Sequence, residues 1–543
     1  MNAKELRDVA EELFSKRCML LSLWQDISEN FYPSRADFTL RREIGEEFGR
    51  NLMTSYPVMV QRDLANTLGS MLRPTSQDWF HFRTANVNVD KDVEARQWLE
   101  WAEATQRRAM YDLSAQFTRA TKEGDHDYSA FGQCAISVEL IPAINSLLYR
   151  CWHLRDMAWA ENQYGAIGQV FRKWKTTVRT LVRTFPGKVS QSVVTAASKS
   201  PFEEIECMHM VVEADMYDLK VNTPYISIYY DCRNDQVLEA VGVYDLIYVI
   251  PRWQTVSGSQ YAYSPATIAG LPEARLLQAM TATLLEAGEK MTNPPMVATQ
   301  EAIRSDISIY AGGITWVDAA YDERLGEVLR PLTQDKSGMP LGMEMQKDSR
   351  AVLMECFYLN KFGMPDRGSA EMTAFEVGQR VQEYIRGALP IFEPMEQDYN
   401  GQMCEMTFNR LQRAGTFGDP RNMPRALRGG AEVEFEFVSP LHDAIESQKT
   451  QKFMEMKTVI AEAVAVDQEA IDAIDVTEAL RDALLATIPA GWVSTEAEIE
   501  MKKGKRKEAA AMQASLAAME QASMVAKNTG DAAKSFSQAQ APV

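Results

Sequence analysis

The residues that come closest to a catalytic grouping are Glu123, Asp125, His126 and Asp127, which place three carboxylates and an imidazole within five positions. A metal-dependent enzyme needs several such oxygens to converge on one ion. A charge run beside a glycine is more often a solvated turn, here before Tyr128, and we favour that interpretation. The metal-dependent enzyme stays open as the less favoured alternative.

The short motifs of phosphate and metal chemistry do not occur in the sequence. It has no Gly-x-x-x-x-Gly-Lys-Ser/Thr, no His-Glu-x-x-His and no Gly-x-Ser-x-Gly. The seven cysteines are scattered and never form Cys-x-x-Cys, so reduced thiols are expected. We therefore predict a protein that is not an enzyme and holds neither a cofactor nor a metal.

The charge balance limits how the chain can treat a polyanion. With 57 Lys and Arg against 75 Asp and Glu, the formal net charge is −18. Tight DNA binding neutralises phosphates with cations, so this charge argues against a protein that grips DNA. It is compatible with one that lets DNA slide past a few local cations. The basic run at 502–507 could touch nucleic acid, but nearby glutamates favour a solvated helix face.

Hydrophobic patterning predicts a soluble, folded chain with no membrane segment. Hydrophobic residues make up 46%, no run of about 18 uncharged apolar residues occurs, and 1–21 is charged throughout, which argues against a signal peptide. The 29 methionines could form a promiscuous binding surface, but those at helical spacing, such as Met403 and Met406, are interpreted as core. The aromatic stretch from Trp98 to Trp101 is also interpreted as core.

The first half of the chain is predicted to combine helices with a β-rich lobe. Apolar spacing indicates one helix up to Pro33, a second ending at Pro74, an extended segment at 78–82 and a further helix over 90–119. Strands are predicted at 136–141, 154–160, 167–174, 225–231, 237–243 and 245–250, with Thr176 and Thr177 capping a short helix.

The second half is predicted to be mostly helical. A long helix starts at Ser264-Pro265 and ends at 293–295, and a Gly-punctuated insert over 296–340 precedes another helix at about 348–361. Thr373 and Glu376 form a capping box, 433–438 alternates as a strand, and the chain beyond 440 is predicted helical. The fold class is therefore α+β, predominantly α-helical.

Several short segments, in order, resemble the head-to-tail connecting (portal) proteins of short-tailed double-stranded DNA phages. The N-terminal ones are 64–74 (LANTLGSMLRP) with Trp79-Phe80, then 130–135 (AFGQCA) and 160–162 (AEN) with 170–172 (VFR). The central ones are 251–253 (PRW), Tyr261, 264–266 (SPA), 271–272 (LP) and 293–295 (NPP). The last are 372–377 (MTAFEV) and 439–441 (SPL). Each is weak alone, and their shared order across about 60–490 carries the resemblance.

The resemblance implies a portal fold assembled as a ring of twelve subunits. It assigns 1–263 to an N-terminal α+β wing, 264–294 to stem helix I, 295–340 to the clip and 341–361 to stem helix II. It assigns 362–372 to a tunnel loop, 373–440 to a kinked wing helix and strand, and 441–543 to a helical crown or barrel with a disordered tail. Subunits would meet head to tail in a heterologous contact that closes.

The resemblance also implies a function without chemistry. The ring would form the channel for packaging and ejecting viral DNA at the capsid portal vertex, after assembly in the host cytoplasm. Its expected partners are other copies of itself, duplex DNA, capsid and scaffold proteins, the terminase large subunit and then a tail adaptor. A tail adaptor or tube ring protein is the alternative, although such proteins are usually shorter and lack a stem hairpin.

Four residues are expected to serve these contacts. Lys361 and Arg367, at the edge of and within the glycine-containing loop 362–372, would meet DNA phosphates in the channel. Tyr310 and Trp316, beside the turn dipeptide Gly312-Gly313, would lie at the clip interface.

Overall fold

A computed structural model describes most of the 543-residue chain. The described residues are 1–292 with short gaps at 44, 75–77, 87–88, 90–91 and 142–145, then 296–298, 329–331, 338–362, 387, 394–419, 423–428, 433–437, 504 and 506. The chain forms two compact units: unit 1 comprises 1–81, 103–418 and 435–441, and unit 2 the remainder. Three elements belong partly to each unit, namely β1 (Phe80–Thr84), α5 (Val93–Met110) and β12 (Val433–Phe437).

The N-terminal segment forms two helices, so the prediction of one continuous helix was wrong. α1 (Ala3–Lys16) begins with a capping box between Asn2 and Glu5, and α2 (Cys18–Phe31) ends before Pro33 as predicted. Arg17 separates them because its buried guanidinium donates to the backbone carbonyls of Leu154 (2.7 Å) and Arg155. The break between α1 and α2 therefore falls at the residue whose side chain bonds these two carbonyls.

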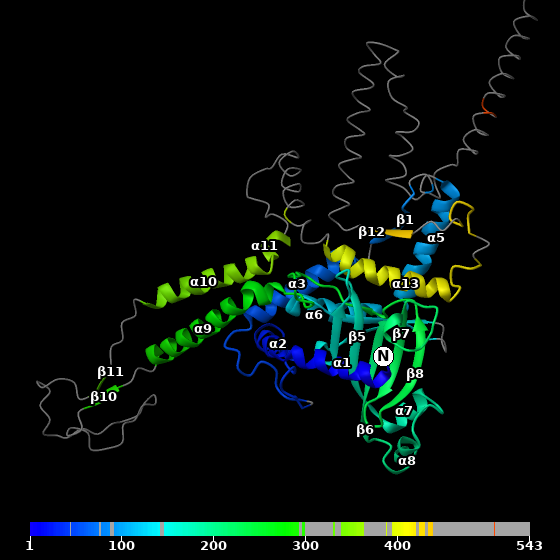
Figure 1. Cartoon of the computed structure of the whole chain (residues 1–543). Coiled ribbons are helices and arrows are strands. Elements are labelled where there is room, and N and C mark those ends of the chain that lie inside the picture. Colours follow the sequence, from blue (N-terminus) through cyan, green and yellow to red (C-terminus); the bar gives the residue numbers. More distant parts are fainter. Residues whose placement is uncertain are drawn as a thin grey trace, which may run out of the picture. The chain divides into compact units, whose positions relative to one another are not determined.

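Two helices at the centre of unit 1 pack against each other (Figure 1). α3 (Tyr56–Leu72) ends at Arg73, just before Pro74, as predicted. α5 stops at Met110, and α6 (Phe117–Phe131) starts after the left-handed Gln116, so the single helix predicted over 90–119 is interrupted. The carboxylates at 123–127 lie inside α6 and not in a solvated turn, which corrects our favoured interpretation of them.

A five-stranded antiparallel meander forms the main sheet of unit 1, in the order β4-β5-β6-β7-β8. Its strands are β4 (Met157–Glu161), β5 (Ile167–Thr177), β6 (Glu204–Glu213), β7 (Tyr225–Asp231) and β8 (Gln236–Val243). α1 covers one face, where Leu6 and Ala10 pack with Met208, Met210 and Ile228. α7 (Val178–Thr184) and α8 (Gln191–Lys199) connect β5 to β6, and Thr177 caps α7 as predicted.

A smaller sheet has the order β3-β2-β9. It consists of β2 (Ala135–Ile141), β3 (Ser146–Trp152) and the two-residue β9 (Tyr248–Val249). Beyond it, a π-helical segment (Glu396–Gly401) leads into α13 (Gln402–Arg413). Met403 and Leu411 of α13 are both buried.

Other sequence predictions have mixed outcomes. All seven cysteines are free thiols. Trp101 is 48% exposed and Trp98 half-buried, so the core interpretation of that stretch was wrong. Among the described helices none is long and apolar enough to cross a membrane. The capping box at Thr373, the Gly312-Gly313 turn and the helices expected after 440 lie outside the described residues.

Candidate functional site

The helices predicted on either side of the insert form an antiparallel hairpin in unit 1 (Figure 1). α9 (Leu271–Thr292) follows a π-helical turn at Ala266–Gly270, and α10 (Gly338–Cys356) returns beside it. α10 starts about ten residues earlier than predicted because Pro340 falls in its first turn, where a missing backbone N–H costs nothing. α11 (Leu359–Phe362) follows after Tyr358, which has a left-handed φ of 56°.

Small residues let the two helices of the hairpin approach closely. A Cβ on Gly342 would lie 2.9 Å from Leu284 Cδ2, and Gln346 Nε2 donates to Thr281 Oγ1 at 2.8 Å. Between the helices lies a cavity of about 440 Å³, lined largely by methionine and alanine. The hairpin is nevertheless not fully packed, because six of its large apolar side chains are exposed. They are Leu276, Leu285, Leu341, Met343, Met345 and Val352.

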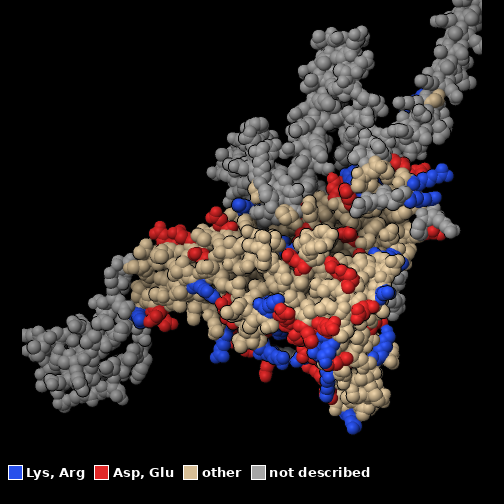
Figure 2. Space-filling model, in the orientation of Figure 1, with Lys and Arg blue, Asp and Glu red and all other residues tan. Residues whose placement is uncertain are grey.

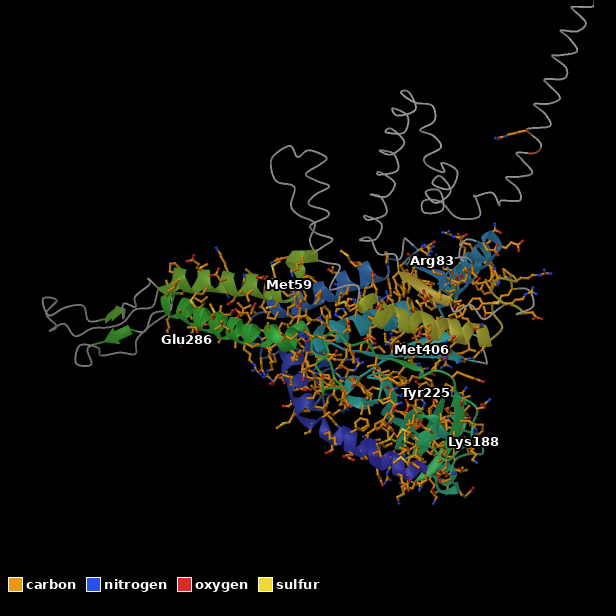
Figure 3. All side chains as sticks on the ribbon, turned by 45° about the horizontal axis from the view of Figure 1, so that its top comes forward. Met59, Arg83, Lys188, Tyr225, Glu286 and Met406 are labelled. Carbon is orange, nitrogen blue, oxygen red and sulfur yellow. The ribbon has the colours of Figure 1, made fainter. Side chains whose placement is uncertain are left out.

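A short strand pair follows the distal end of the hairpin. β10 (Met296–Ala298) pairs antiparallel with β11 (Leu329–Pro331), and Met296 lies opposite Pro331. Figure 3 labels Glu286 in the distal half of α9, on the approach to this pair. Tyr310 and Trp316, the predicted clip residues, fall between the two strands and lie outside the described residues.

One side chain clamps the base of α9 to the loop before α3. Gln278 Oε1 accepts from the backbone N–H groups of Met53 (2.8 Å) and Thr54 (2.9 Å), while its Nε2 donates to the Thr54 carbonyl at 2.9 Å. Arg275 adds an ion pair with Asp26 at 2.7 Å. The amide thus uses three hydrogen bonds to fix where the hairpin leaves the body of unit 1.

A second set of contacts holds α10 at the same level. The Tyr56 hydroxyl donates to the Arg350 carbonyl at 3.3 Å, and the Arg350 guanidinium lies 5.2 Å from the Tyr56 ring centroid. Phe357 packs on Phe31 with ring centroids 5.1 Å apart. A Cβ on Gly270 would lie 2.9 Å from the Phe357 ring, so the glycine admits that ring beside the π-helical turn.

The segments that carry the family resemblance meet where the hairpin begins. Gly132 has φ +78°, and a Cβ there would lie 2.6 Å from the Tyr263 carbonyl carbon, so the site requires glycine. Gln133 Oε1 accepts from Ala262 N–H at 2.9 Å. Ser264 Oγ donates to the Ala130 carbonyl at 2.7 Å. The sequence revealed these residues only as an ordered series, and their convergence became visible in the structure.

Two further segments of the series join through Arg252. Its side chain pairs with Glu161 and donates to the Gly165 carbonyl at 3.0 Å. Its backbone N–H donates to Asp398 Oδ2 at 2.8 Å. Burial raises the pKa of Asp398 above the ordinary aspartate value, although hydrogen bonds from Arg252 and Gln402 oppose that effect.

The carboxylates of the candidate cluster form ion pairs with arginines. Arg73 pairs with Asp125, both side chains being almost fully buried, and donates to Asn400 Oδ1 at 2.8 Å. Asn400 in turn donates to the Leu72 carbonyl at 3.0 Å. Burial alone would lower the pKa of Arg73, but the Asp125 carboxylate outweighs burial and the pKa is raised. A Cβ on Gly69 would lie 2.9 Å from Asp125 Oδ2, which explains the glycine in the segment 64–74.

The neighbouring acids are paired in the same way. Arg35 binds Asp127 with two hydrogen bonds of 3.1 and 2.7 Å, and Glu123 with one of 2.9 Å. Burial would lower the pKa of Arg35, yet Asp127 raises it overall. Burial lowers the pKa of His126, which disfavours the protonated ring. Among the described residues no three acids, histidines or cysteines are arranged to hold a metal ion. The ion pairs of Arg35 with Asp127 and of Arg73 with Asp125 link α6 to the chain around residues 35 and 73.

The predicted channel residues are only partly described. Lys361 is exposed near the end of α11, with its amine 5.5 Å from the Tyr358 ring centroid. Arg367 lies outside the described residues. The segment 362–372 therefore starts at the end of α11, directly after the returning helix α10 of the hairpin.

The observed features describe a scaffold: a hairpin with an uncovered apolar surface, anchored to a body in which the buried charges pair with one another. Proteins of this class support an assembly. Comparisons with known proteins agree. The chain is 25% identical over 475 residues to the probable portal protein of Bordetella phage BPP-1, covering 86% of this chain and 83% of that protein. It is 22% identical over 484 residues to the portal protein of Salmonella phage epsilon15, covering 86% and 84%.

A sequence model of the family described as "Bacteriophage head to tail connecting protein" matches residues 3–490. This chain belongs to that family of phage portal proteins, which are structural, non-enzymatic virion components at a capsid vertex. The resemblance recognised in the ordered segments is confirmed.

Proposed function

We propose that this chain assembles into a closed ring of about twelve subunits whose central channel carries double-stranded DNA into and out of the phage head. In this assignment α9 and α10 are the two stem helices, and the residues from 295 to 340 are the clip. Each subunit meets its neighbours head to tail, so that one face of a subunit always contacts a different face of the next.

The observation that carries the proposal is the hairpin with its six exposed large apolar side chains. Six exposed large apolar side chains on one helix pair are what a hairpin covered by neighbouring subunits would show. Burying one leucine side chain contributes about 1.5–3 kcal/mol, so covering these residues with a neighbouring hairpin would stabilise a ring. The anchors at Gln278 and Tyr56 hold the hairpin in one direction, as a shared channel wall requires.

The charge of the hairpin is more compatible with DNA that slides through a channel than with tightly bound DNA. The described hairpin carries acids on both arms, among them Glu273, Glu286, Glu289 and Glu344, with fewer cations between them. A wall of this kind repels phosphates and leaves local contacts to a few basic groups. We assign that role to Lys361 and Arg367 of the tunnel loop at 362–372.

The partners follow from the same arrangement. The clip, with Tyr310 and Trp316, would dock the terminase large subunit during packaging and a tail adaptor afterwards. The remaining surface of the ring would contact capsid and scaffold proteins. The tail adaptor alternative receives less support, because the family match extends from residue 3 to residue 490.

The test is to replace Lys361 and Arg367 together by alanine in infectious particles. Because the two cations act locally and are screened beyond about 8–10 Å, we expect rings to assemble normally while fewer full-length genomes are packaged or more DNA leaks. Native mass spectrometry measures the ring, and gel analysis of encapsidated DNA measures genome length and retention. Wild-type genome length and retention in the double variant would refute the tunnel-loop role. Isolation of the wild-type protein only as monomers or two-fold dimers would refute the ring.

A further inference from the structure

One stretch of the sequence departs sharply from the acidic character of the chain. No Asp or Glu occurs between Glu161 and Glu203, although acids make up 75 of the 543 residues. The same stretch carries seven cations: Arg172, Lys173, Lys175, Arg179, Arg183, Lys188 and Lys199. In a chain with a net charge of −18, this concentration of positive charge needs an explanation.

The acid-free stretch includes the helical connection at one end of the main sheet. We call residues 178–202, which include α7 and α8, the basic knob. Its apolar side chains face the sheet: Val178, Leu181 and Phe185 of the α7 segment and Val193 of α8 form a core cluster with Ile205 and Leu238. Figure 1 places both helices at the lower end of the sheet, and Figure 2 shows Lys and Arg side chains at this end. Lys188 is labelled there in Figure 3.

Partners within the subunit account for some of these cations. Lys173 pairs with Glu11 at 2.6 Å and Lys188 with Glu239 at 2.7 Å. Arg172 is buried, with its guanidinium 3.7 Å from the Trp152 ring centroid. Lys175 lies opposite Glu206 in the register of β5 and β6.

Three cations of the basic knob have no acidic partner among the described residues. Arg179, Arg183 and Lys199 are exposed, and no carboxylate among the described residues lies within 4 Å of their nitrogens. At the base of the knob, Glu203 is itself paired with Arg233 at 2.6 Å. The outward-facing positions of α8 are mostly uncharged polar residues, so nothing on this helix repels an anion.

We propose that the basic knob binds the phosphate backbone of double-stranded DNA, without reading its sequence, at a site separate from the hairpin and the tunnel loop. Arg179 and Arg183 are four residues apart on α7, so their Cβ atoms lie about 5–6 Å from each other on one helix face. Arginine suits this task because its planar guanidinium donates two parallel hydrogen bonds to a phosphate. Lys199, at the end of α8, adds a third positive charge.

The surface favours DNA over an acidic protein. Protein interfaces are centred on buried aromatic and aliphatic anchors. On the basic knob only two large hydrophobic residues, Val194 and Phe202, are exposed. Phosphate contacts need only cations and freedom from carboxylates, and the knob offers both.

The binding should be weak and strongly dependent on salt. Each neutralised phosphate contributes about 0.9 to the slope of log affinity against log salt concentration. The three cations without acidic partners thus give a slope of log affinity against log salt concentration of at most about 3 for each subunit that contacts the duplex. The net acidity of the chain opposes binding, so the experiment belongs at low ionic strength.

The experiment uses the full chain and a closed circular duplex plasmid, which cannot thread through a closed ring and so reports only outer surfaces. The test variant is R179Q/R183Q/K199Q. The matched control, R108Q/R119Q/K122Q, removes the same charge from exposed cations of α5 and α6. At about 50 mM salt we expect the test variant to bind at least about tenfold more weakly and the control to stay within about twofold of wild type. Native mass spectrometry and thermal unfolding verify that both variants assemble and fold.

Three results would overturn the proposal. They are equal plasmid binding by wild type and the knob variant, equal losses in knob variant and control, and no plasmid binding by wild type at low salt. If polyglutamate binds wild type through these three residues while the plasmid does not, the knob takes an acidic protein and the DNA assignment is wrong. The variant K361A/R367A should bind the plasmid like wild type, so failure of the tunnel-loop proposal remains distinguishable from failure of this one.

Discussion

The centre of unit 1 and the α9–α10 hairpin treat their side chains in opposite ways. Around α3 and α6 the subunit buries charged groups, and each acid there finds an arginine of the same chain. Along the hairpin it leaves leucine and methionine side chains exposed. The first region satisfies its charges within one subunit, whereas in the proposed ring the second would be covered by a neighbouring subunit. Under that proposal, the contrast separates residues needed for folding from residues needed for assembly.

The largest effect on subunit stability is expected from Asp125→Ala. The substitution leaves Arg73, whose side chain is 4% exposed, without its counter-charge. Removing one partner of a buried pair costs about 3–5 kcal/mol. Denaturant unfolding measures this loss. Asp63→Ala is the control, because the contact of Asp63 with Arg62 is 3.8 Å long and exposed, and it should cost less than about 1 kcal/mol. Equal losses in both variants would mean that the buried pair does not stabilise the centre.

A smaller loss is expected from Gly132→Ala. Alanine would adopt the left-handed backbone at a cost of about 1–2 kcal/mol and would also press its Cβ against the Tyr263 backbone, 2.6 Å away. Gly165→Ala is matched in conformation, with φ +75° and no atom within 4 Å, so it should show the backbone cost alone. Unfolding curves for the two variants isolate the contact. If they coincide, Gly132 is not needed for the close approach that starts the hairpin.

The smallest change in subunit stability, with the largest change in assembly, is expected from Leu285→Ser combined with Leu341→Ser. Both side chains are more than half exposed, so the free energy of unfolding of the monomer should change by less than about 0.5 kcal/mol per substitution. Native mass spectrometry at micromolar protein should instead show rings giving way to smaller species. Leu219→Ser with Val241→Ser, on exposed residues outside the hairpin, is the control. An unchanged ring population in the hairpin variant would contradict the assembly role.

Local patterns predicted the elements whose signals are local. Alternation placed β12 and helical spacing placed α3, and Thr177 caps α7 through its side chain as predicted. The breaks were missed because their causes are distant in sequence. Arg17 interrupts a helix to reach carbonyls at 154 and 155, and no window around Arg17 contains them.

The candidate site likewise combines features that local sequence predicted with contacts between residues distant in sequence. The ordered segments identified the family without indicating why their residues are needed, since Gly132 meets Ser264 and Arg73 meets Asp125 only after folding. The charge run at 123–127 was misread for a related reason. A run of acids looks solvated unless one knows that arginines from 35 and 73 reach it.

The amide of Gln278 has a mechanical consequence for a particle that fills with a polyelectrolyte. Counterions accumulate around packed DNA, and they weaken exposed ion pairs such as Arg275 with Asp26. A neutral side chain that bonds two backbone N–H groups and a carbonyl has no net charge to screen. The angle at which α9 leaves the body of unit 1 should therefore be the same at low and at high salt concentration.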